Sequence, residues 1–323
     1  MTEPIEIFSS VTPAKHRRRA FGYSVYLIAV LLFSINGTAS KAIMSVGMSP
    51  EHLSQLRATC SFVVLLIASL VTRPRAMRTT PREFGLLAAY GVLGVTMTQY
   101  LYFVAIHRLP VGVALLLEFT APIMIAVWLR YARKQQVKKQ LWLGLALALA
   151  GLALVARVWK GLTLDGGGVL AGLGAAAALA VYYLVGEKSA GTRDPLTLTT
   201  WSFGFATAFW AIAKPWNTFP WELLHKHAVL ETTFGQFNLP VVVLASYMVL
   251  FGSVIAFGLV NLSLRHLSAS QASVIGMCEP LMASAVAWSI LNEQLALVQI
   301  IGGLVVLAGI VLAELSRSPS RTR

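Results

Sequence analysis

The chain has 323 residues, of which 57% are hydrophobic and only 12% are charged, and its mean hydropathy is +0.71. Soluble domains carry roughly a quarter of charged residues, so this composition excludes an ordinary soluble protein and indicates one that spans a membrane. The net charge of +13 does not indicate nucleic-acid binding, because the basic residues cluster in short connections between long apolar runs.

A basic segment, residues 1–20, precedes the first apolar run and is expected to lie in the cytosol. A transmembrane helix needs about 20 apolar residues, and ten runs of about this length follow. We predict transmembrane helices at 23–46, 53–71, 84–105, 110–129, 141–158, 167–186, 196–213, 240–262, 268–291 and 296–314. A basic tail, residues 316–323, follows the last of them. The predicted fold class is therefore an all-α membrane protein with ten transmembrane helices.

The basic residues are distributed unevenly between alternate connections. Nineteen of the 26 Lys and Arg residues fall on the side of the N-terminus, five fall on the other side, and Lys41 and Arg57 lie within helices. Cytosolic connections are enriched in Lys and Arg, so this bias predicts that both termini are cytosolic and that the number of helices is even. The longest outer connection, about 214–239, contains tryptophans and is expected to pack at the membrane surface.

The two halves of the chain are related by an internal repeat with a constant separation of 158 residues. The matched pairs include Pro122 and Pro280, Gly144 and Gly302, and Gly151 and Gly309. We expect the first repeat to cover 21–160 and the second to cover 165–315. Each repeat has five predicted helices, so the second copy must be inverted in the membrane. Inverted repeats around a substrate site near the midplane are a recurring plan of transporters.

Two glutamates interrupt apolar runs at the depth of the membrane midplane. Glu118 lies in the run Leu-Leu-Leu-Glu-Phe-Thr-Ala-Pro at 115–122, and Glu279 directly precedes Pro280. A charged carboxylate at this depth costs about 2.5–3.5 kcal/mol, so each is a candidate functional residue. The alternative is a protonated carboxyl group that serves packing. We expect both to line a cavity between helices, and Pro122 and Pro280 to break the helices that carry them.

Other polar side chains within the predicted helices are further candidates for binding substrate or protons. They are Asn36, Lys41, Arg57, Gln99, Tyr102 and Tyr182. Lys41 and Arg57 either extend their charged ends to the membrane surface or attract a substrate carboxylate. Asn36 and Gln99 can instead bond across helices, and the tyrosines can serve packing. A separate set of glycines in the fifth and tenth helices is expected to permit close backbone contact: Gly144, Gly151, Gly302, Gly303 and Gly309.

No motif in the sequence indicates catalysis or a cofactor. The chain has no Walker loop, HExxH or CxxC pattern, and no Ser-His-Asp arrangement stands out. His225 and His227 are two residues apart and would not share a helix face, which argues against a metal site. We therefore expect neither an enzyme nor a bound metal or cofactor.

These features resemble the EamA-type transporters of the drug/metabolite transporter superfamily. The resemblance rests on the five-plus-five plan, on Lys41 and Arg57, on the Leu-Glu-Phe-Thr-Ala-Pro run, and on the Glu279-Pro280 pair. Within that family, the surroundings of Glu118 and Glu279 are most similar to those of threonine/homoserine exporters. The resemblance implies a secondary exporter of a small polar metabolite, first of all amino acids, in the plasma or inner membrane, as a monomer or homodimer.

Three alternatives stay open: a multidrug exporter of the same fold, a metabolite importer of the same fold, and a membrane enzyme or scaffold that transports nothing. The expected partners are the bilayer, a small substrate and protons, without nucleic acid. Burial disfavours a charged carboxylate, so a glutamate in the cavity can hold a proton until an aminated substrate displaces it. The sequence favours Glu279 for the proton and Glu118 for the substrate, because Pro280 can open the backbone to water.

Overall fold

The computed structural model describes residues 13–158, 165–232, 235–290 and 296–316. Within these ranges, eight helical segments are long and apolar enough to cross a membrane. Their bounds are Arg19–Ser45, Pro50–Thr72, Pro81–Arg108, Val111–Tyr131, Gly166–Ala190, Pro195–Ala213, Val241–Ser263 and Leu297–Leu315. Each coincides within a few residues with a predicted helix, because the length of an apolar run is a local property of the sequence.

The other two predicted crossings are helical but do not meet the same criteria. α7 (Lys139–Val155) is apolar and has 17 residues. The predicted helix at 268–291 consists of α12 (Ala269–Gly276) and α13 (Glu279–Ile290), and residues 291–295 lie outside the described ranges. The basic segment at 1–20 and the tail at 316–323 also fall largely outside the described residues.

Several crossings are built from more than one element. Besides α7, the crossings made of a single helix are α1 (Pro13–Ser45), α2 (Pro50–Thr72), α8 (Gly166–Ala190), α9 (Pro195–Ala213) and α14 (Leu297–Leu315). The composite ones are α3 (Pro81–Ala89), η2 (Tyr90–Thr96) and α4 (Met97–Arg108); α5 (Val111–Glu118) and α6 (Ala121–Tyr131); and α10 (Val241–Val249), η5 (Leu250–Ile255) and α11 (Ala256–Ser263). Short 3₁₀ turns η1 (Pro74–Met77), η3 (Trp216–Thr218) and η4 (Trp221–His225) lie in the connections.

Three of the helices start with the same local signal, a capping side chain followed by proline. Ser49, Thr80 and Asp194 accept hydrogen bonds from backbone N–H groups in the first turns of α2, α3 and α9. Proline follows each of them, where its missing N–H costs nothing because first-turn N–H groups have no intrahelical partner. The starts of these helices are therefore fixed by the local sequence.

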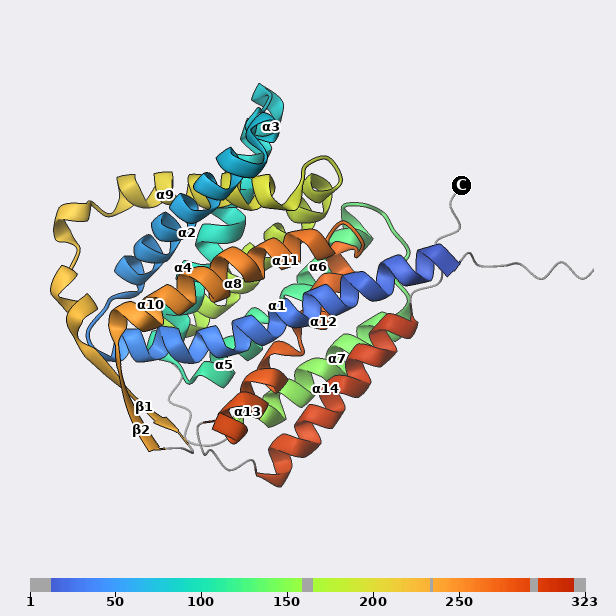
Figure 1. The fold of residues 1–323 in the computed structure, drawn as a ribbon. Helices are drawn as coiled ribbons and strands as arrows, with labels where there is room; N and C mark the ends of the chain where they lie inside the picture. The colour runs from blue at the N-terminus through green and yellow to red at the C-terminus, as the bar shows by residue number, and fades with distance from the viewer. Residues whose placement is uncertain (1–12, 159–164, 233–234, 291–295, 317–323) are drawn as a thin grey trace, which may run out of the picture.

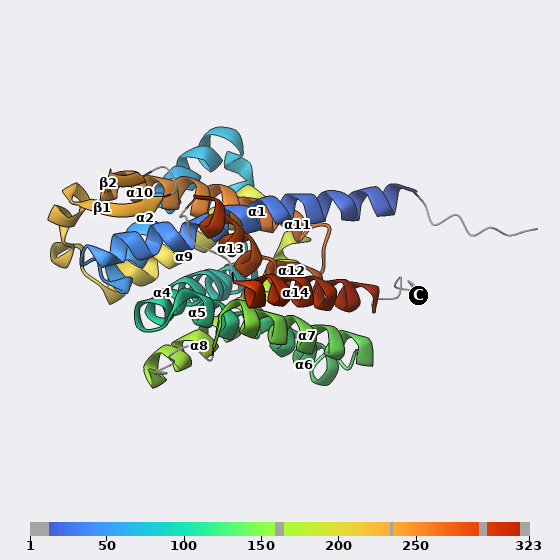
Figure 2. The same ribbon diagram turned by 90° about the horizontal axis from the view of Figure 1, so that it is seen from below.

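The start of α1 and the end of α14 lie at one end of the helical bundle, and a β-hairpin lies at the opposite end (Figures 1 and 2). The hairpin pairs β1 (His227–Thr232) with β2 (Gly235–Pro240), from His227 opposite Pro240 to Thr232 opposite Gly235. The sequence predicted a surface connection here and no strand. Ala228 is buried in a cluster with Phe219 and Leu223, so the hairpin forms where the connection packs onto the bundle.

α7 and α14 lie side by side with their backbones in close contact, as four of the five glycines predict (Figure 1). A Cβ atom at Gly144 would lie 2.7 Å from the carbonyl oxygen of Gly309, and one at Gly151 would lie 2.7 Å from that of Gly302. Gly303 is not part of this contact, because its nearest neighbour is the Leu281 side chain at 3.9 Å. Residues of both helices share a core cluster with residues of α5 and α12, so the α7–α14 pair packs against the two broken crossings.

Candidate functional site

The fourth and ninth predicted crossings are both broken in mid-course, and a glutamate stands at each break. α5 ends at Glu118 and α6 begins at Ala121, whereas α12 ends at Gly276 and α13 begins at Glu279. Pro122 and Pro280 each take the second position of the new half-helix, where proline is tolerated. Each proline therefore starts a half-helix, and the break lies just before it.

A cavity of about 80 Å³, enough for several water molecules, lies between these breaks and the neighbouring helices. Seven of the eight sequence-predicted site residues line it: Asn36, Arg57, Gln99, Tyr102, Glu118, Tyr182 and Glu279. The remaining lining residues were not among the eight predicted site residues: Tyr26, Phe33, Gly37, Gly94, Thr98, Phe119, Leu179, Tyr183, Phe257 and Val260. Most of these are aromatic or small, and nothing in a hydrophobic sequence separates them from ordinary packing residues.

The two carboxyl groups differ in the helix end that carries them. Glu118 is the last residue of α5 and Glu279 is the first residue of α13. The N-terminus of a helix favours negative charge and the C-terminus opposes it. Within the described part of the chain, neither carboxyl group has a hydrogen-bond or ion-pair partner, although the two lie close enough to influence each other electrostatically. The pair is therefore open to a ligand or to protons.

Arg57 provides a buried positive charge in the same cavity. Its Nε donates to Ser253 Oγ at 2.6 Å, and its Nη2 donates to the carbonyl oxygen of Gly252 at 2.5 Å. The guanidinium carbon lies 5.7 Å and 5.9 Å from the ring centres of Phe103 and Phe257, distances typical of cation–π contact. The side chain is 3% exposed and points inward, which excludes the alternative that it extends to the membrane surface.

The acceptors of Arg57 belong to η5, a π-helical segment that has a counterpart in the first half of the chain. η5 interrupts the eighth crossing and η2 interrupts the third. In each, a hydroxyl group bonds the carbonyl oxygen five residues earlier: Thr96 Oγ1 to Gly91 at 2.8 Å, and Ser253 Oγ to Met248 at 2.9 Å. Single π-helical turns within α-helices occur frequently at functional sites. Sequence analysis missed both segments.

A matched pair of glycines was the available signal for these segments. Gly94 in η2 and Gly252 in η5 are separated by the repeat distance of 158 residues. A Cβ at Gly94 would lie 3.2 Å from the backbone of Tyr182, and a Cβ at Gly252 would collide with Asn36 Oδ1. Each glycine therefore permits a helix that carries a cavity residue to approach a π-helical segment closely.

Three buried polar atoms on the residues around the cavity have no hydrogen-bond partner within the described residues: Asn36 Oδ1, Gln99 Nε2 and Tyr182 Oη. These side chains are only 4%, 9% and 4% exposed. Buried polar groups without a partner are rare, because leaving one unpaired costs about 1–3 kcal/mol. The cavity thus offers hydrogen-bond acceptors and donors to a polar occupant.

Three polar contacts, two of which join the two halves of the chain, lie on or near the residues that line the cavity. The hydroxyl groups of Tyr26 and Tyr183 bond to each other. Tyr90 Oη donates to Asn261 Oδ1 at 2.6 Å, and Asn261 Nδ2 donates to Thr199 Oγ1 at 2.8 Å. All five residues lie in the halves of their helices that are nearer to the end of the bundle with the start of α1 and the end of α14. None of these contacts was predicted from the sequence, because the partners are up to 171 residues apart.

Lys41 is the one predicted site residue that does not line this cavity. It is exposed and borders a second cavity of about 500 Å³, together with Thr38, Ser45, Ser284 and Gln299. Pro280 lines the second cavity while its neighbour Glu279 lines the first. The two cavities therefore adjoin the same helix break from different sides. Within the described ranges, no three His, Cys, Asp or Glu side chains are grouped closely enough to hold a metal ion.

The model of the EamA-like transporter family matches residues 20–157 and, a second time, residues 166–315. The chain belongs to the EamA-like transporter family. The EamA-like model thus covers nearly the whole chain in two copies, in agreement with the internal repeat. This membership and the apolar helices indicate a multi-pass membrane transporter.

Several EamA-like relatives extend over almost the same length. An uncharacterized transporter of Archaeoglobus fulgidus is 25% identical over 90% of this chain and 94% of that protein. The threonine/homoserine exporter RhtA of Escherichia coli K12 is 22% identical over 90% of each chain. A crystal structure matches with a TM-score of 0.69 at 17% identity, covering 92% of this chain and 97% of that one, which shows a shared fold.

Proposed function

We propose that this EamA-like transporter is a secondary exporter of amino acids, which bind as zwitterions in the central cavity. The observation that carries the proposal is the combination, in one cavity, of the buried cation Arg57 with the unpartnered carboxyl groups of Glu118 and Glu279. An amino acid brings one carboxylate and one ammonium group, which complement these charges. The relatives named threonine/homoserine exporters support the same substrate class.

The proposed architecture has ten transmembrane helices as two inverted repeats, at 21–160 and 165–315. An even number of crossings agrees with the position of the ends of α1 and α14 at one end of the bundle (Figure 2). The excess of Lys and Arg on the side of the N-terminus supports a cytosolic location of both termini, in the plasma membrane. Under this orientation, the tyrosine contacts close the cytosolic end, and the cavity beside Lys41 lies toward the outside.

The helix ends suggest a division of roles between the two glutamates that differs from the one favoured by the sequence. Glu279 begins α13, where the helix dipole favours a carboxylate, so we assign it to the substrate ammonium group. Glu118 ends α5, where the dipole opposes a carboxylate, so we assign it to the transported proton. Arg57 then receives the substrate carboxylate, to which Gln99 Nε2 can donate, whereas Asn36 Oδ1 can accept from the ammonium group or a hydroxyl group of the substrate.

Alternating access follows from the contacts between the two halves. The Tyr26–Tyr183 and Tyr90–Asn261 hydrogen bonds must break for substrate to enter from the cytosol. A proton on Glu118 and a substrate ammonium group at Glu279 would disfavour each other, because the two carboxyl groups lie close enough to interact electrostatically and protonation of Glu118 removes negative charge that attracts the ammonium group. One proton then enters for each amino acid that leaves, while the repeats move around a fixed site.

The test is transport by purified protein in proteoliposomes with an imposed pH gradient. The panel contains threonine, homoserine, phenylalanine and one lipophilic cation, which represents the multidrug alternative. Threonine or homoserine should move against its own gradient when the pH gradient drives it. If the cation moves and no amino acid does, or if nothing on the panel moves, the proposed substrate class is wrong.

Matched Glu→Gln variants test the roles of the carboxyl groups. Glu279→Gln should weaken substrate binding, whereas Glu118→Gln should still bind substrate and exchange it but lose its dependence on the pH gradient. Glu51→Gln is the control, because Glu51 lies outside the cavity and bonds Tyr100 at 3.2 Å. Undiminished gradient-driven transport by Glu118→Gln would refute its role as the proton carrier.

A further inference from the structure

An apolar groove of about 340 Å³ lies on the bundle between α2, the start of α3 and α9, away from both cavities described above. Aromatic and aliphatic side chains line it: Phe62, Leu66, Met77, Phe84, Trp201 and Phe205. Phe84 is 46% exposed, and its ring packs edge-on against those of Trp201 and Phe205. An open groove of this composition on a transmembrane surface faces lipid chains.

Four exposed arginines accompany the groove along one short stretch of chain. Arg73, Arg75, Arg78 and Arg82 run from the end of α2 through η1 to the start of α3. The same stretch contributes Met77 and continues to Phe84, both of which line the groove. None of the four forms an ion pair within the described part of the chain. The groove therefore has an apolar floor and an uncompensated cationic border.

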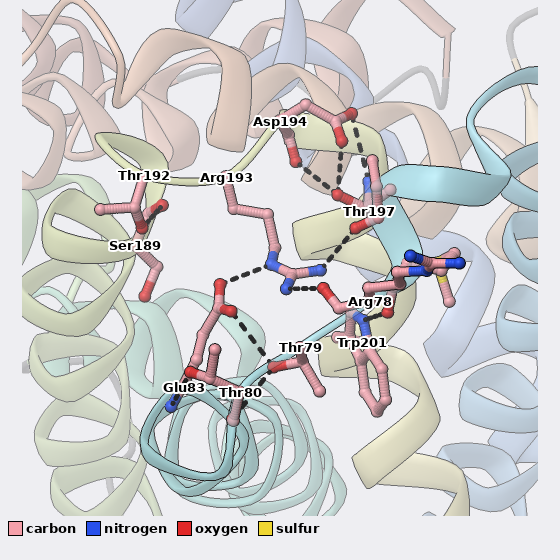
Figure 3. A network of polar contacts seen from close by, with 12 residues as sticks. Arg78, Thr79, Thr80, Glu83, Ser189, Thr192, Arg193, Asp194, Thr197 and Trp201 are labelled. Atoms are coloured by element: carbon pink, nitrogen blue, oxygen red, sulfur yellow. Dashed lines mark hydrogen bonds and ion pairs between the residues drawn. The ribbon is translucent and has the colours of Figure 1, made fainter.

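The cationic border is held firmly by Arg193, as Figure 3 shows. This arginine precedes α9 and is 7% exposed. Its Nε donates to Glu83 Oε1 at 2.8 Å, and its Nη1 and Nη2 donate to the carbonyl oxygens of Ala76 at 2.9 Å and Arg78 at 2.8 Å. Arg193 thus fixes η1 against α9 and occupies Glu83, the acidic residue nearest in sequence to the four free arginines.

A second contact ties the same segment to the groove wall. The indole Nε1 of Trp201 donates to the carbonyl oxygen of Met77 at 3.2 Å. Tryptophan is enriched where the hydrocarbon core meets the headgroup region, because its ring is apolar and its N–H is polar. We therefore expect the edge of the groove formed by Trp201 and Met77 to lie at headgroup level, beside the arginines.

We propose that this groove is a specific binding site for an anionic phospholipid. An acyl chain lies along the aromatic floor, and the phosphate meets the arginines of the segment 73–82. The segment connects the second and third crossings, so under the proposed orientation the lipid belongs to the cytosolic leaflet. Basic sites of this kind on the cytosolic side of membrane proteins recognise anionic headgroups. Charge complementarity and the apolar floor together select a lipid over a soluble anion.

The test is native mass spectrometry of the detergent-purified protein with phosphatidylglycerol or phosphatidylcholine of identical acyl chains. The wild-type protein should retain phosphatidylglycerol more strongly. Replacing all four arginines by glutamine should abolish this difference. Each arginine that contacts the phosphate should contribute roughly fivefold to the affinity for phosphatidylglycerol. The control removes four charges from a different connection predicted to lie on the same side: Arg130→Gln, Arg133→Gln, Lys134→Gln and Lys139→Gln.

A second variant tests the groove floor without altering charge. Ala208 is exposed and lines the groove, so Ala208→Trp should fill it and reduce retention of both lipids while the bundle stays folded. Equal retention of the two lipids by the wild-type protein would overturn the proposal. So would an equal loss in the control variant, which would indicate a response to total surface charge, or full retention by Ala208→Trp. The measurement needs no substrate, so it stands independently of the proposed transport function.

Discussion

The Gly151→Ala variant adds one methyl group and tests whether the close contact between α7 and α14 stabilises the bundle around the cavity. A Cβ at Gly151 would lie 2.6 Å from the backbone nitrogen of Val306 and 2.7 Å from the carbonyl oxygen of Gly302, whereas ordinary contact begins near 3.4 Å. Both neighbours are backbone atoms, so the helices themselves must move apart. Phe119 and Met277, at the two helix breaks, share a core cluster with these helices, so the movement reaches the cavity.

The expected cost follows from two opposing terms. Overpacking of a close contact costs about 1–3 kcal/mol, and the backbone clash on two sides places Gly151→Ala toward the upper part of this range. Replacing glycine by alanine within a helix gains about 1 kcal/mol. We therefore expect a net loss of about 1–2 kcal/mol, which corresponds to a decrease in Tm of several degrees in thermal unfolding of the detergent-purified protein.

Gly303→Ala is the matched control on the same helix pair. Its nearest neighbour would be the Leu281 side chain at 3.9 Å, which is ordinary contact, so only the gain in helix propensity remains. The Tm of this variant should be unchanged or slightly higher. If Gly151→Ala and Gly303→Ala shift the Tm by the same amount in the same direction, the close backbone contact does not govern the stability of this pair.

Two further predictions concern charged groups at the helix ends. Arg193→Gln should destabilise the protein by about 2–5 kcal/mol, because it removes three hydrogen bonds donated by a buried guanidinium group, to Glu83 and to two backbone carbonyl oxygens. Loss of the exposed Arg108–Asp165 pair through Arg108→Gln should change the Tm little, and equal losses of Tm would refute the distinction. The N–H of Gly168, and next Arg108, hold the pKa of Asp165 below its ordinary value, so its contribution to stability is present above about pH 4 and disappears as the pH falls through the lowered pKa. The Tm difference between wild type and Asp165→Ala should therefore be largest near pH 7 and shrink toward pH 3, and a constant difference would contradict this.

The sequence alone predicted the features that depend on local properties of the chain. Eight of the ten apolar runs correspond to helices long and apolar enough to cross a membrane, because run length is readable without knowledge of packing. Breaks at Pro122 and Pro280 follow from the missing N–H of proline. The repeat indicated that Gly144 is equivalent to Gly302 and Gly151 to Gly309. The structure brings these glycines into contact across the repeats, Gly144 with Gly309 and Gly151 with Gly302.

Only the tertiary structure decided which polar residues meet. Arg57 and Lys41 were equivalent candidates in the sequence, yet the structure buries Arg57 at η5 and leaves Lys41 beside a different cavity. The outcome depends on the rotation of each helix about its own axis, and that rotation is set by packing against helices from the other half of the chain. The hydrogen bonds of Tyr90 to Asn261 and of Arg193 to Glu83 join residues more than 100 positions apart, so no local sequence pattern predicts them. In a chain whose helices are apolar on nearly every face, hydrophobic periodicity does not show which face of a helix points into the bundle. Only the arrangement of the helices determines that face.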